Sequence, residues 1–312
     1  MSILGLETVK MSKKFGGFTA LDSIDLEVNE GEVFGYIGPN GAGKTTTIRV
    51  LLGILQATSG SARVFGMDAW KDAVQIHKRI AYVPGDVNLW PNLTGGEVVD
   101  LFVSLRGRHD KARREKLLKS FDLDPSKKCR TYSKGNRQKV ALVAALASDA
   151  DFYILDEPTS GLDPLMEQVF QECVFDLKKD GKGVFLSSHI MSEVEKLCDR
   201  IAIIREGKLV ETGTLDQMRH LTRVTMTIKT EKPVEGLDKI KGVYDITTHQ
   251  GGLSFQVGSA EIPAVVSYIS KYGVTKLEST PPTLEDLFMR HYDLGTDALG
   301  SPRADEHANE VN

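Results

Sequence analysis

Short apolar runs alternate with segments of helical period over residues 1–221. This pattern predicts strands at 33–37, 63–65, 81–83, 152–155, 184–187 and 201–204, and helices at 43–55, 96–106, 111–121, 135–147 and 164–179. Short apolar strands separated by helices are typical of an α/β domain with a mainly parallel central sheet. Segment 4–28 instead alternates polar and apolar residues and carries FGGF at 15–18, which favours an antiparallel β region.

The pattern changes after His220. Val224–Lys229 alternates between polar and apolar residues. Further strands are predicted at 242–247, 253–257 and 275–279, helices at 260–272 and 283–292, and a weak helix near 235–240. This order suggests a small α+β domain over 222–292, similar to a ferredoxin-like sandwich. Residues 293–312 contain few apolar side chains, so we expect a disordered tail.

Composition and charge narrow the class of protein. Apolar residues make up 41% of the chain, its net charge is −4 and its pI is near 6.0. Such a chain has no overall basic field, so we expect no nucleic acid partner. The cysteines are far apart without C-x-x-C spacing, which argues against a zinc site or a disulfide framework. No apolar run approaches the roughly 18 residues of a membrane span and the N-terminus lacks a signal-peptide pattern, so we expect a cytoplasmic protein that reaches a membrane only through a partner.

The segment GPNGAGKTT at 38–46 matches the phosphate-binding motif G-x-x-x-x-G-K-[ST] between an apolar strand and a helix. Its glycines let backbone N–H groups turn toward a phosphate, and the helix N-terminus adds a positive dipole end. Lys44 can bridge the β- and γ-phosphates, and Thr45 can ligate Mg²⁺. We assign binding of a nucleoside triphosphate with Mg²⁺ to Gly38, Asn40, Gly41, Gly43, Lys44, Thr45 and Thr46.

A second segment, FYILDEP at 152–158, delivers two acids at the end of a buried strand. Asp156 suits Mg²⁺ binding, either as a direct ligand or by holding one of the ion's ligands. Glu157 is placed to orient or deprotonate an attacking water. Together with the phosphate loop, these acids fit any P-loop nucleoside triphosphatase.

Three more motifs are more selective. YSKGNRQKVALVAALA at 132–147 is similar to the LSGGQ signature, Ser160–Asp163 matches the D-loop, and Ser187-Ser188-His189 matches the switch histidine. In this order and spacing the motifs resemble the ATPase subunit of an ABC transporter over residues 1–221. The resemblance implies an α/β P-loop fold with a mostly parallel core sheet, an antiparallel β region and a helical subdomain. The C-terminal segment, with PPTLEDLF at 281–288, looks like the accessory domain of exporter ATPases whose permeases are of the ABC-2 type.

The resemblance implies further site residues. Phe15, 29 positions before Lys44, would stack on adenine; the alternatives are that Phe15 is simply buried or that Phe18 takes this role. Ser133 and Gly135 would bind the γ-phosphate held by the opposite subunit. The D-loop acid Asp163 and the switch histidine His189 complete the set: Asp163 is assigned to nucleotide binding, and His189 would contact the γ-phosphate and hold Glu157 and water. The same resemblance implies a nucleotide-sandwich dimer, of two copies or with a second ATPase subunit, that drives transport, in the export direction, through a separate integral-membrane permease.

The sequence departs from the family pattern at two places. In the signature, Lys134 and Asn136 replace a glycine and a glutamine. Gly85 stands where the family has a glutamine that reaches Mg²⁺ and water. Asp86 is a candidate replacement ligand because it is an adjacent oxygen donor, and the alternative is a solvated loop acid.

The loop that leaves this strand contains apolar residues that a permease could contact. We interpret Trp90, Leu93 and Val98–Val99 as partner-facing, with internal packing of Trp90 under the helical subdomain as the alternative. The rival function is a soluble ABC-type ATPase acting on ribosomes or DNA, but the chain has neither a second cassette nor long coiled coils. The cargo is chosen by the permease and cannot be derived from this chain.

Overall fold

The computed structural model describes residues 4–105, 110–220, 223–249, 252–258 and 260–280. The chain divides into two compact units, Met1–Leu215 and Asp216–Asn312. The division falls six residues before the predicted boundary at 221/222, so that most of α8 (Leu215–His220) belongs to the second unit. Each unit is described by itself below. Among the described residues, no helix is long and apolar enough to span a membrane.

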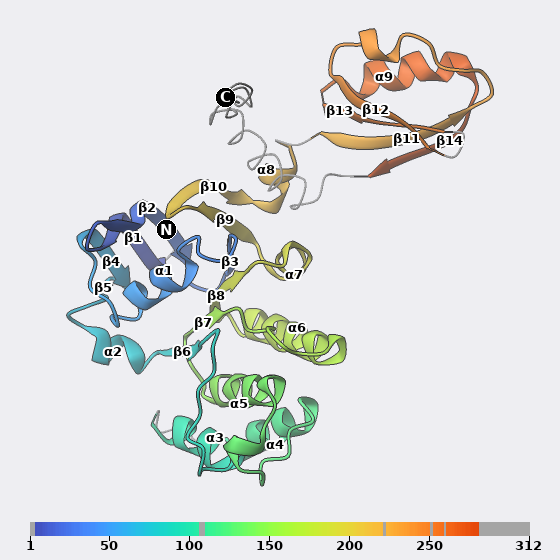
Figure 1. Cartoon of the computed structure of the whole chain (residues 1–312). Coiled ribbons are helices and arrows are strands. Elements are labelled where there is room, and N and C mark those ends of the chain that lie inside the picture. Colours follow the sequence, from blue (N-terminus) through green and yellow to red (C-terminus); the bar gives the residue numbers. More distant parts are fainter. Residues whose placement is uncertain (1–3, 106–109, 221–222, 250–251, 259, 281–312) are drawn as a thin grey trace, which may run out of the picture. The chain divides into compact units, whose positions relative to one another are not determined.

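The first unit is built on a six-stranded sheet (Figure 1). Its strand order is β10 (Lys208–Thr214), β9 (Arg200–Arg205), β3 (Val33–Ile37), β8 (Gly183–Ser188), β7 (Phe152–Asp156) and β6 (Ile80–Val83). All neighbours are parallel except β9 and β10. Every residue of β3, β7 and β8 is buried, which accounts for their nearly continuous apolar sequences. The predicted parallel core is confirmed.

An antiparallel sheet lies beside this core, as the alternating pattern of segment 4–28 predicts. Its order is β2 (Phe18–Asn29), β1 (Leu4–Phe15), β4 (Ser59–Val64) and β5 (Met67–Asp68). One hydrophobic cluster joins Leu6 and Val28 of this sheet, Ile48 of α1 (Lys44–Leu51), and Phe34 and Ile154 of the central sheet. Helix α1 is therefore packed by both sheets, and its N-terminus is fixed at the end of β3.

Three helices gather away from the central sheet in Figure 1: α3 (Gly95–Ser104), α4 (Lys111–Ser120) and α5 (Lys134–Ala147). Each begins at a polar cap, because the side chains of Thr94, Asp110 and Ser133 accept hydrogen bonds from the backbone of the first helical turn. The remaining helices of the unit are α2 (Ala73–His77), α6 (Pro164–Lys179) and α7 (Met191–Leu197).

Some predicted bounds were wrong. The helix predicted over 43–55 ends at Leu51, because Gly53 adopts a left-handed φ of 65° that a helix cannot continue. The strand predicted at 63–65 begins at Ser59 and ends at Val64. The last residue of the predicted helix 96–106 lies outside the described residues.

The second unit has a four-stranded sheet in the order β12 (Val243–His249), β13 (Gly252–Val257), β11 (Val224–Thr230) and β14 (Val274–Thr280). All neighbours are antiparallel, so β11 and β12 run parallel with β13 between them, as in a split βαβ unit. In the chain, a 3₁₀ turn (Leu237–Lys239) connects β11 to β12 where a helix was expected. Helix α9 (Ile262–Ile269) packs through Val265 and Ile269 on Met226, Ile228 and Phe255. The predicted helix 283–292, the PPTLEDLF segment and the tail 293–312 lie outside the described residues.

Candidate functional site

The parallel strands β3, β7 and β8 end at the same edge of the central sheet. In register, Ile37 of β3 lies beside Ser188 of β8, and Asp156 of β7 beside Ser187. The loop 38–43 leaves β3 at this edge and enters α1. Because ligands of open α/β sheets bind outside the carboxyl ends of the strands, this edge is where the predicted phosphate loop and acids should meet. The structure brings them together.

The phosphate loop has the backbone geometry of an anion cradle. Gly41 and Gly43 adopt φ values of 82° and 114°, which residues with a side chain rarely reach. Gly43 is the N-cap of α1 and provides no capping side chain, so the first-turn N–H groups of α1 are not covered by a cap. A cavity of about 170 Å³ lies against the loop and is lined by Phe18, Ala20, Pro39, Asn40, Gly41, Gly43, Lys44, Thr45, Thr46 and Glu157.

Lys44 is 5% exposed, and oxygen atoms surround its ammonium group. Its Nζ donates to the carbonyl oxygens of Gly38 at 2.6 Å and Pro39 at 3.2 Å, and lies 3.2 Å from Oε1 of Glu157. A β-carbon at Gly38 would lie 2.4 Å from the carbonyl oxygen of Ile204, so only glycine fits there. The loop therefore holds a buried cation beside the cavity.

The two residues predicted to hold magnesium form a direct pair. Thr45 Oγ1 donates to Oδ2 of Asp156 at 2.9 Å, and Ser187 Oγ donates to Oδ1 of the same carboxylate at 2.5 Å. Asp156 is 1% exposed, so its orientation is fixed. Hydroxyl and carboxylate oxygens are hard ligands that suit Mg²⁺, which usually binds one or two carboxylates together with substrate phosphates. The donor set fits this ion.

Glu157 is held in an unusual backbone conformation. Its φ is 46°, and its N–H donates to the carbonyl oxygen of Ser187 at 3.1 Å and to Ser187 Oγ at 3.2 Å. Non-glycine residues adopt this region at an energetic cost that the surrounding structure must offset. The strained bend turns the carboxylate toward Lys44 and His189, which places an acid at the cavity.

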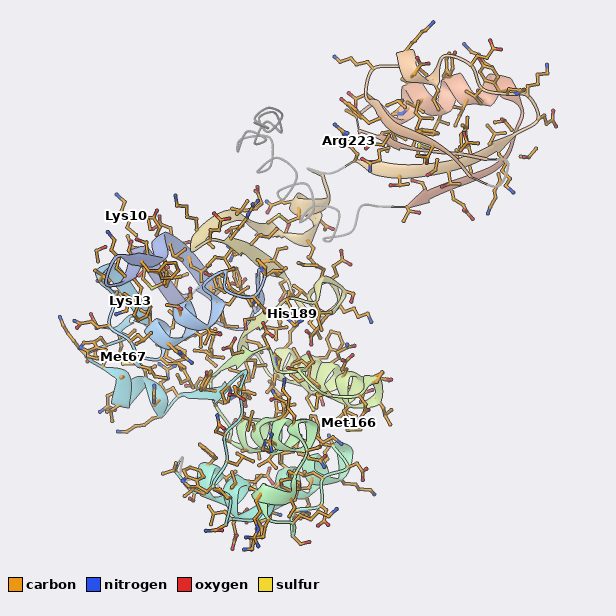
Figure 2. The ribbon with its side chains drawn as sticks, in the orientation of Figure 1. Lys10, Lys13, Met67, Met166, His189 and Arg223 are labelled. Carbon is orange, nitrogen blue, oxygen red and sulfur yellow. The ribbon has the colours of Figure 1, made fainter. Side chains whose placement is uncertain are left out.

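His189 follows β8 directly and lies next to α7 (Figure 2). Its Nδ1 lies 3.1 Å from Oε2 of Glu157, while half of its side chain is exposed. The structure therefore brings together Lys44, Glu157 and His189, as the sequence predicts. Sequence reasoning gave Ser187 no role of its own, although Ser187 contacts both Asp156 and Glu157. The sequence feature that could have indicated a role for Ser187 is its hydroxyl side chain at the end of a predicted central strand.

The signature segment lies on another surface of the same unit. Ser133 caps α5 through a 3.2 Å bond from the N–H of Asn136, and Asp163 caps α6 through a 3.0 Å bond from the N–H of Met166. The two segments touch, because Lys134 Nζ lies 3.1 Å from Ser160 Oγ. A β-carbon at Gly135 would lie 2.4 Å from the carbonyl oxygen of Gly161. None of these residues lines the phosphate-loop cavity in the described structure.

The two phenylalanines of the β1–β2 hairpin, Phe15 and Phe18, differ in their position relative to the phosphate-loop cavity. Phe18 lines the cavity, and Phe15 does not. Phe15 pairs with Phe18 across the hairpin, is 48% exposed and has Lys13 Nζ 5.1 Å from its ring centroid. The adenine role of Phe15 stays a prediction, and Phe18 is the competing candidate that lines the cavity.

Gly85 lies against the magnesium pair. A β-carbon there would be 3.6 Å from Asp156 Oδ2, so residue 85 is beside the acid, as the family pattern implies. Burial, followed by the negative charge of Asp156, raises the pKa of Tyr82 to about 12. Asp86 is exposed, and its Oδ2 accepts from Asn88 Nδ2 at 3.4 Å. It makes no hydrogen bond to Thr45 or Asp156 in the described structure, and its role as a ligand stays a prediction.

If Asp86 supplies the oxygen that Gly85 lacks, Asp86→Ala is expected to slow ATP hydrolysis at least about tenfold, because a ligand that orients the reacting groups is lost. ATP binding should change little, and Gly85→Gln in this background should restore part of the rate. Steady-state hydrolysis measures both effects. Asn88→Ala is the matched control, since it removes the partner of Asp86 and leaves the carboxylate. Wild-type turnover by Asp86→Ala would contradict the assignment and leave Gly85 as a hinge of the loop.

An exposed apolar patch lies on the loop after β6 and on α3. Trp90 is 52% exposed and contacts Phe102, with ring centroids 6.2 Å apart. It is therefore not buried under the helical subdomain. The interpretation of Val98 and Val99 as partner-facing was wrong, because both are fully buried. The opposite face of α3 carries the exposed residues, and we define the apolar patch as Trp90, Leu101, Phe102 and Leu105.

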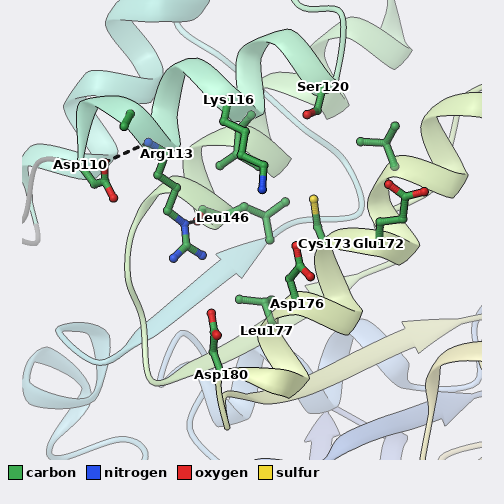
Figure 3. A pocket seen from close by; sticks show the side chains of 13 residues that line it. Asp110, Arg113, Lys116, Ser120, Leu146, Glu172, Cys173, Asp176, Leu177 and Asp180 are labelled. Carbon is green, nitrogen blue, oxygen red and sulfur yellow. Dashed lines mark hydrogen bonds between the residues drawn. The ribbon is translucent and has the colours of Figure 1, made fainter.

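A separate cavity of about 530 Å³ lies between α4 and α6 (Figure 3). Arg113 and Lys116 of α4 face it from one side, and Glu172 and Asp176 of α6 from the other. Burial raises the pKa of the Cys173 thiol in its wall to about 11, so this thiol is protonated at neutral pH. The described residues that line this cavity include no glycine, and we place no nucleotide in it.

Comparison with known proteins agrees with this geometry. Residues 21–160 match the family model described as ABC transporter, and residues 213–292 match that of the C-terminal domain of ATP-binding proteins like DrrA1-3. The chain is 32% identical to the ABC transporter ATP-binding protein YhaQ of Bacillus subtilis over 89% of its length and 95% of that protein. It is 30% identical to the bacitracin transport ATP-binding protein BcrA of Bacillus licheniformis, over 93% of its length and 98% of that protein.

A solved structure has the same fold. It is a dimeric post-hydrolysis state of an ATP-binding cassette bound to ADP and Pi, and its TM-score is 0.62 at 25% identity. The match covers 67% of this chain and 98% of that one.

Proposed function

The chain belongs to the family of ABC transporter ATP-binding proteins, and from this premise we propose that it powers export through a separate membrane permease as one half of a nucleotide-sandwich dimer. It is an ATPase subunit whose ATP hydrolysis is coupled to transport. The observation that carries the proposal is the convergence of Lys44, Asp156, Glu157 and His189 at one edge of the sheet.

In the proposed reaction, phosphate oxygens of ATP replace the carbonyl and carboxylate oxygens that now surround Lys44. Glu157 then orients the attacking water and takes its proton, while His189 holds Glu157 through the Nδ1 contact. Thr45 and Asp156 would hold Mg²⁺, which supplies charge neutralisation at the phosphates. Ser187 fixes both acids at once, because it donates to Asp156 and accepts from the N–H of Glu157.

The second half of the proposed site comes from another subunit. Ser133 and Gly135 lie at the N-terminus of the fourteen-residue helix α5, where backbone N–H groups and the helix dipole favour an anion. Within one chain they lie outside the phosphate-loop cavity, so they reach a γ-phosphate only if a second copy presents them. Both Glu157 and His189 are present, which makes a homodimer the simpler case, and a second ATPase subunit is the alternative partner.

The proposed permease contact is the apolar patch. Exposed aromatic residues such as Trp90 and Phe102 are typical anchors of protein interfaces. A chain without a described membrane-spanning helix would then lie on the cytoplasmic face of the membrane, held by its partner. The rival function on ribosomes or DNA has no support from the relatives, which are named as transport proteins.

Purification from detergent-solubilised membranes tests this function. The tagged chain is expected to bring down an integral-membrane protein, and replacing both Trp90 and Phe102 by serine should weaken its recovery without affecting ATP hydrolysis by the purified chain. Recovery of ribosomes or DNA instead, with no membrane protein, would contradict the transporter assignment.

We propose that the domain 222–292 stabilises or regulates the dimer by packing against its counterpart. No nucleotide motif lies in it, and its described residues have their own hydrophobic core within the unit Asp216–Asn312. A chain ending at residue 221 is therefore expected to bind ATP with an affinity within a few-fold of the full chain, and to dimerise less. Titration with a fluorescent ATP analogue and sedimentation measure the two quantities. Loss of nucleotide binding in a truncated chain that is still folded would show that the boundary or the role is wrong.

A further inference from the structure

The last two residues of β8 make contacts on opposite sides of the strand. Consecutive residues of a strand point to opposite sides, so Ser187 and Ser188 have different partners. Ser187 Oγ donates to Asp156 in the phosphate site. Ser188 Oγ instead donates to Oε2 of Glu193 at 2.9 Å, on the side of α7. The proposed function uses Ser187 and leaves the contact between Ser188 and Glu193 unexplained.

Glu193 is a buried acid, only 6% exposed, in the first turn of α7. Its Oε1 has no hydrogen-bond partner, and among the described residues no other buried side-chain nitrogen or oxygen lacks one. Burial raises the pKa of this carboxyl; the hydroxyls of Ser188 and of the nearby Thr159 lower it, the charge of Glu167 raises it and that of His189 lowers it. Burying a carboxyl with one oxygen unpaired is costly, so the presence of Glu193 needs a reason.

The hydrogen bonds of Ser188 provide one. Its Oγ accepts from the N–H of Ile190 at 3.0 Å while it donates to Glu193. These two bonds tie residues 188, 190 and 193 into one turn, and the residue enclosed by this turn is His189. His189 in turn contacts Glu157 through Nδ1. A path of direct contacts therefore leads from Glu193 through the turn to the proposed general base.

We propose that Glu193 is a positioning residue: its buried carboxyl fixes the 188–190 turn so that His189 stays aligned with Glu157. This inference rests on the proposed ATPase function of the site. Without the carboxyl, the Ser188 hydroxyl is left buried without its acceptor, and the turn gains alternative arrangements that satisfy it. The expected defect is in the chemical step, because neither Glu193 nor Ser188 lines the phosphate-loop cavity.

The kinetic test compares three variants with the wild type. Glu193→Ala is expected to lower kcat for ATP hydrolysis about tenfold, equivalent to about 1.4 kcal/mol, with KM for ATP nearly unchanged. Glu193→Gln keeps an oxygen acceptor for Ser188 and should retain most of the wild-type rate. Ser192→Ala changes an exposed residue of the same helix and should have no effect. A kcat loss in the Gln variant as large as that in the Ala variant would overturn the proposal, as would wild-type turnover by Glu193→Ala.

A double-mutant cycle separates positioning from general destabilisation. If Glu193 acts through His189, Glu193→Ala in a His189→Ala background should lower the single-turnover rate little further. An undiminished further loss of about tenfold would show that Glu193 acts independently of the histidine and would overturn the inference.

Hydrogen exchange supplies a readout that does not depend on activity. Exchange at the Ile190 N–H should rise in Glu193→Ala and not in Glu193→Gln. Unchanged exchange in both variants would contradict the proposed turn. Absence of ATPase activity in the wild type would instead refute the proposed function, so the two failures are distinguishable.

Discussion

Replacing Glu157 by glutamine is expected to lower ATP hydrolysis by about 10²–10⁴-fold while ATP binding is retained. Glutamine has the same shape as glutamate and keeps the backbone bonds to Ser187 that hold residue 157 at its positive φ. What it loses is the ability to take a proton from water. The variant should therefore accumulate as an ATP-bound dimer, which size-exclusion chromatography with and without ATP detects.

Glu172→Gln is the matched control, since it makes the same change of charge at an exposed position of α6. It should hydrolyse ATP at the wild-type rate. A Glu157→Gln variant that retains more than about a tenth of the wild-type rate would contradict the general-base role.

Replacing Gly135 by alanine is expected to lower hydrolysis on the order of 10²-fold, because a small misplacement of groups that contact the reacting phosphate is costly. The new β-carbon would lie 2.4 Å from the carbonyl oxygen of Gly161, so the start of α5 and the 160–163 segment must move apart. ATP binding by the isolated chain should be unaffected, since its own phosphate loop is intact. Fluorescence titration and steady-state hydrolysis together measure this separation of binding from turnover.

Gly181→Ala controls for the general cost of removing a glycine. Gly181 has a φ of 70° and open space around the position of its β-carbon, so the substitution strains the backbone without a clash. It should lower the stability of the fold by about 1 kcal/mol and leave the hydrolysis rate per folded molecule unchanged. Equal loss of activity in the two variants would mean that Gly135 has only a structural role.

The parts of the fold that follow from local pattern were predictable. The strands β3, β7 and β8 are buried on both faces and therefore read as apolar runs. Polar and apolar residues alternate along the antiparallel region because one of its faces is packed on α1. The short elements α2, β5, α7, β10 and α8 were missed, since two to seven residues carry too little periodicity to be detected. The end of α1 was misjudged because its stop depends on the left-handed conformation of Gly53.

The site was predictable where a motif fixes geometry by itself. The phosphate loop, Asp156 and Glu157 each sit at the end of a strand, and parallel strands bring such ends together. Individual side-chain contacts could not be predicted: Ser187 with Asp156 and Lys134 with Ser160 join distant segments, and Glu193 with Ser188 joins a strand end to the next helix. The contacts of Ser187 and Ser188 depend on side-chain direction along β8, which one residue of shift would reverse. The choice between Phe15 and Phe18 failed to resolve for the same reason.

Mixing two inactive variants tests the shared nucleotide site most directly. Lys44→Ala removes the cation of the phosphate loop. Gly135→Ala disrupts the signature helix that a chain presents to the phosphate loop of its partner. In a mixed dimer, one of the two sites combines the intact phosphate loop of one chain with the intact signature helix of its partner. Random pairing at equal concentrations makes about half of the dimers mixed, so about a quarter of the wild-type ATPase activity should return. Activity no greater than the sum of the two variants measured alone would contradict the account.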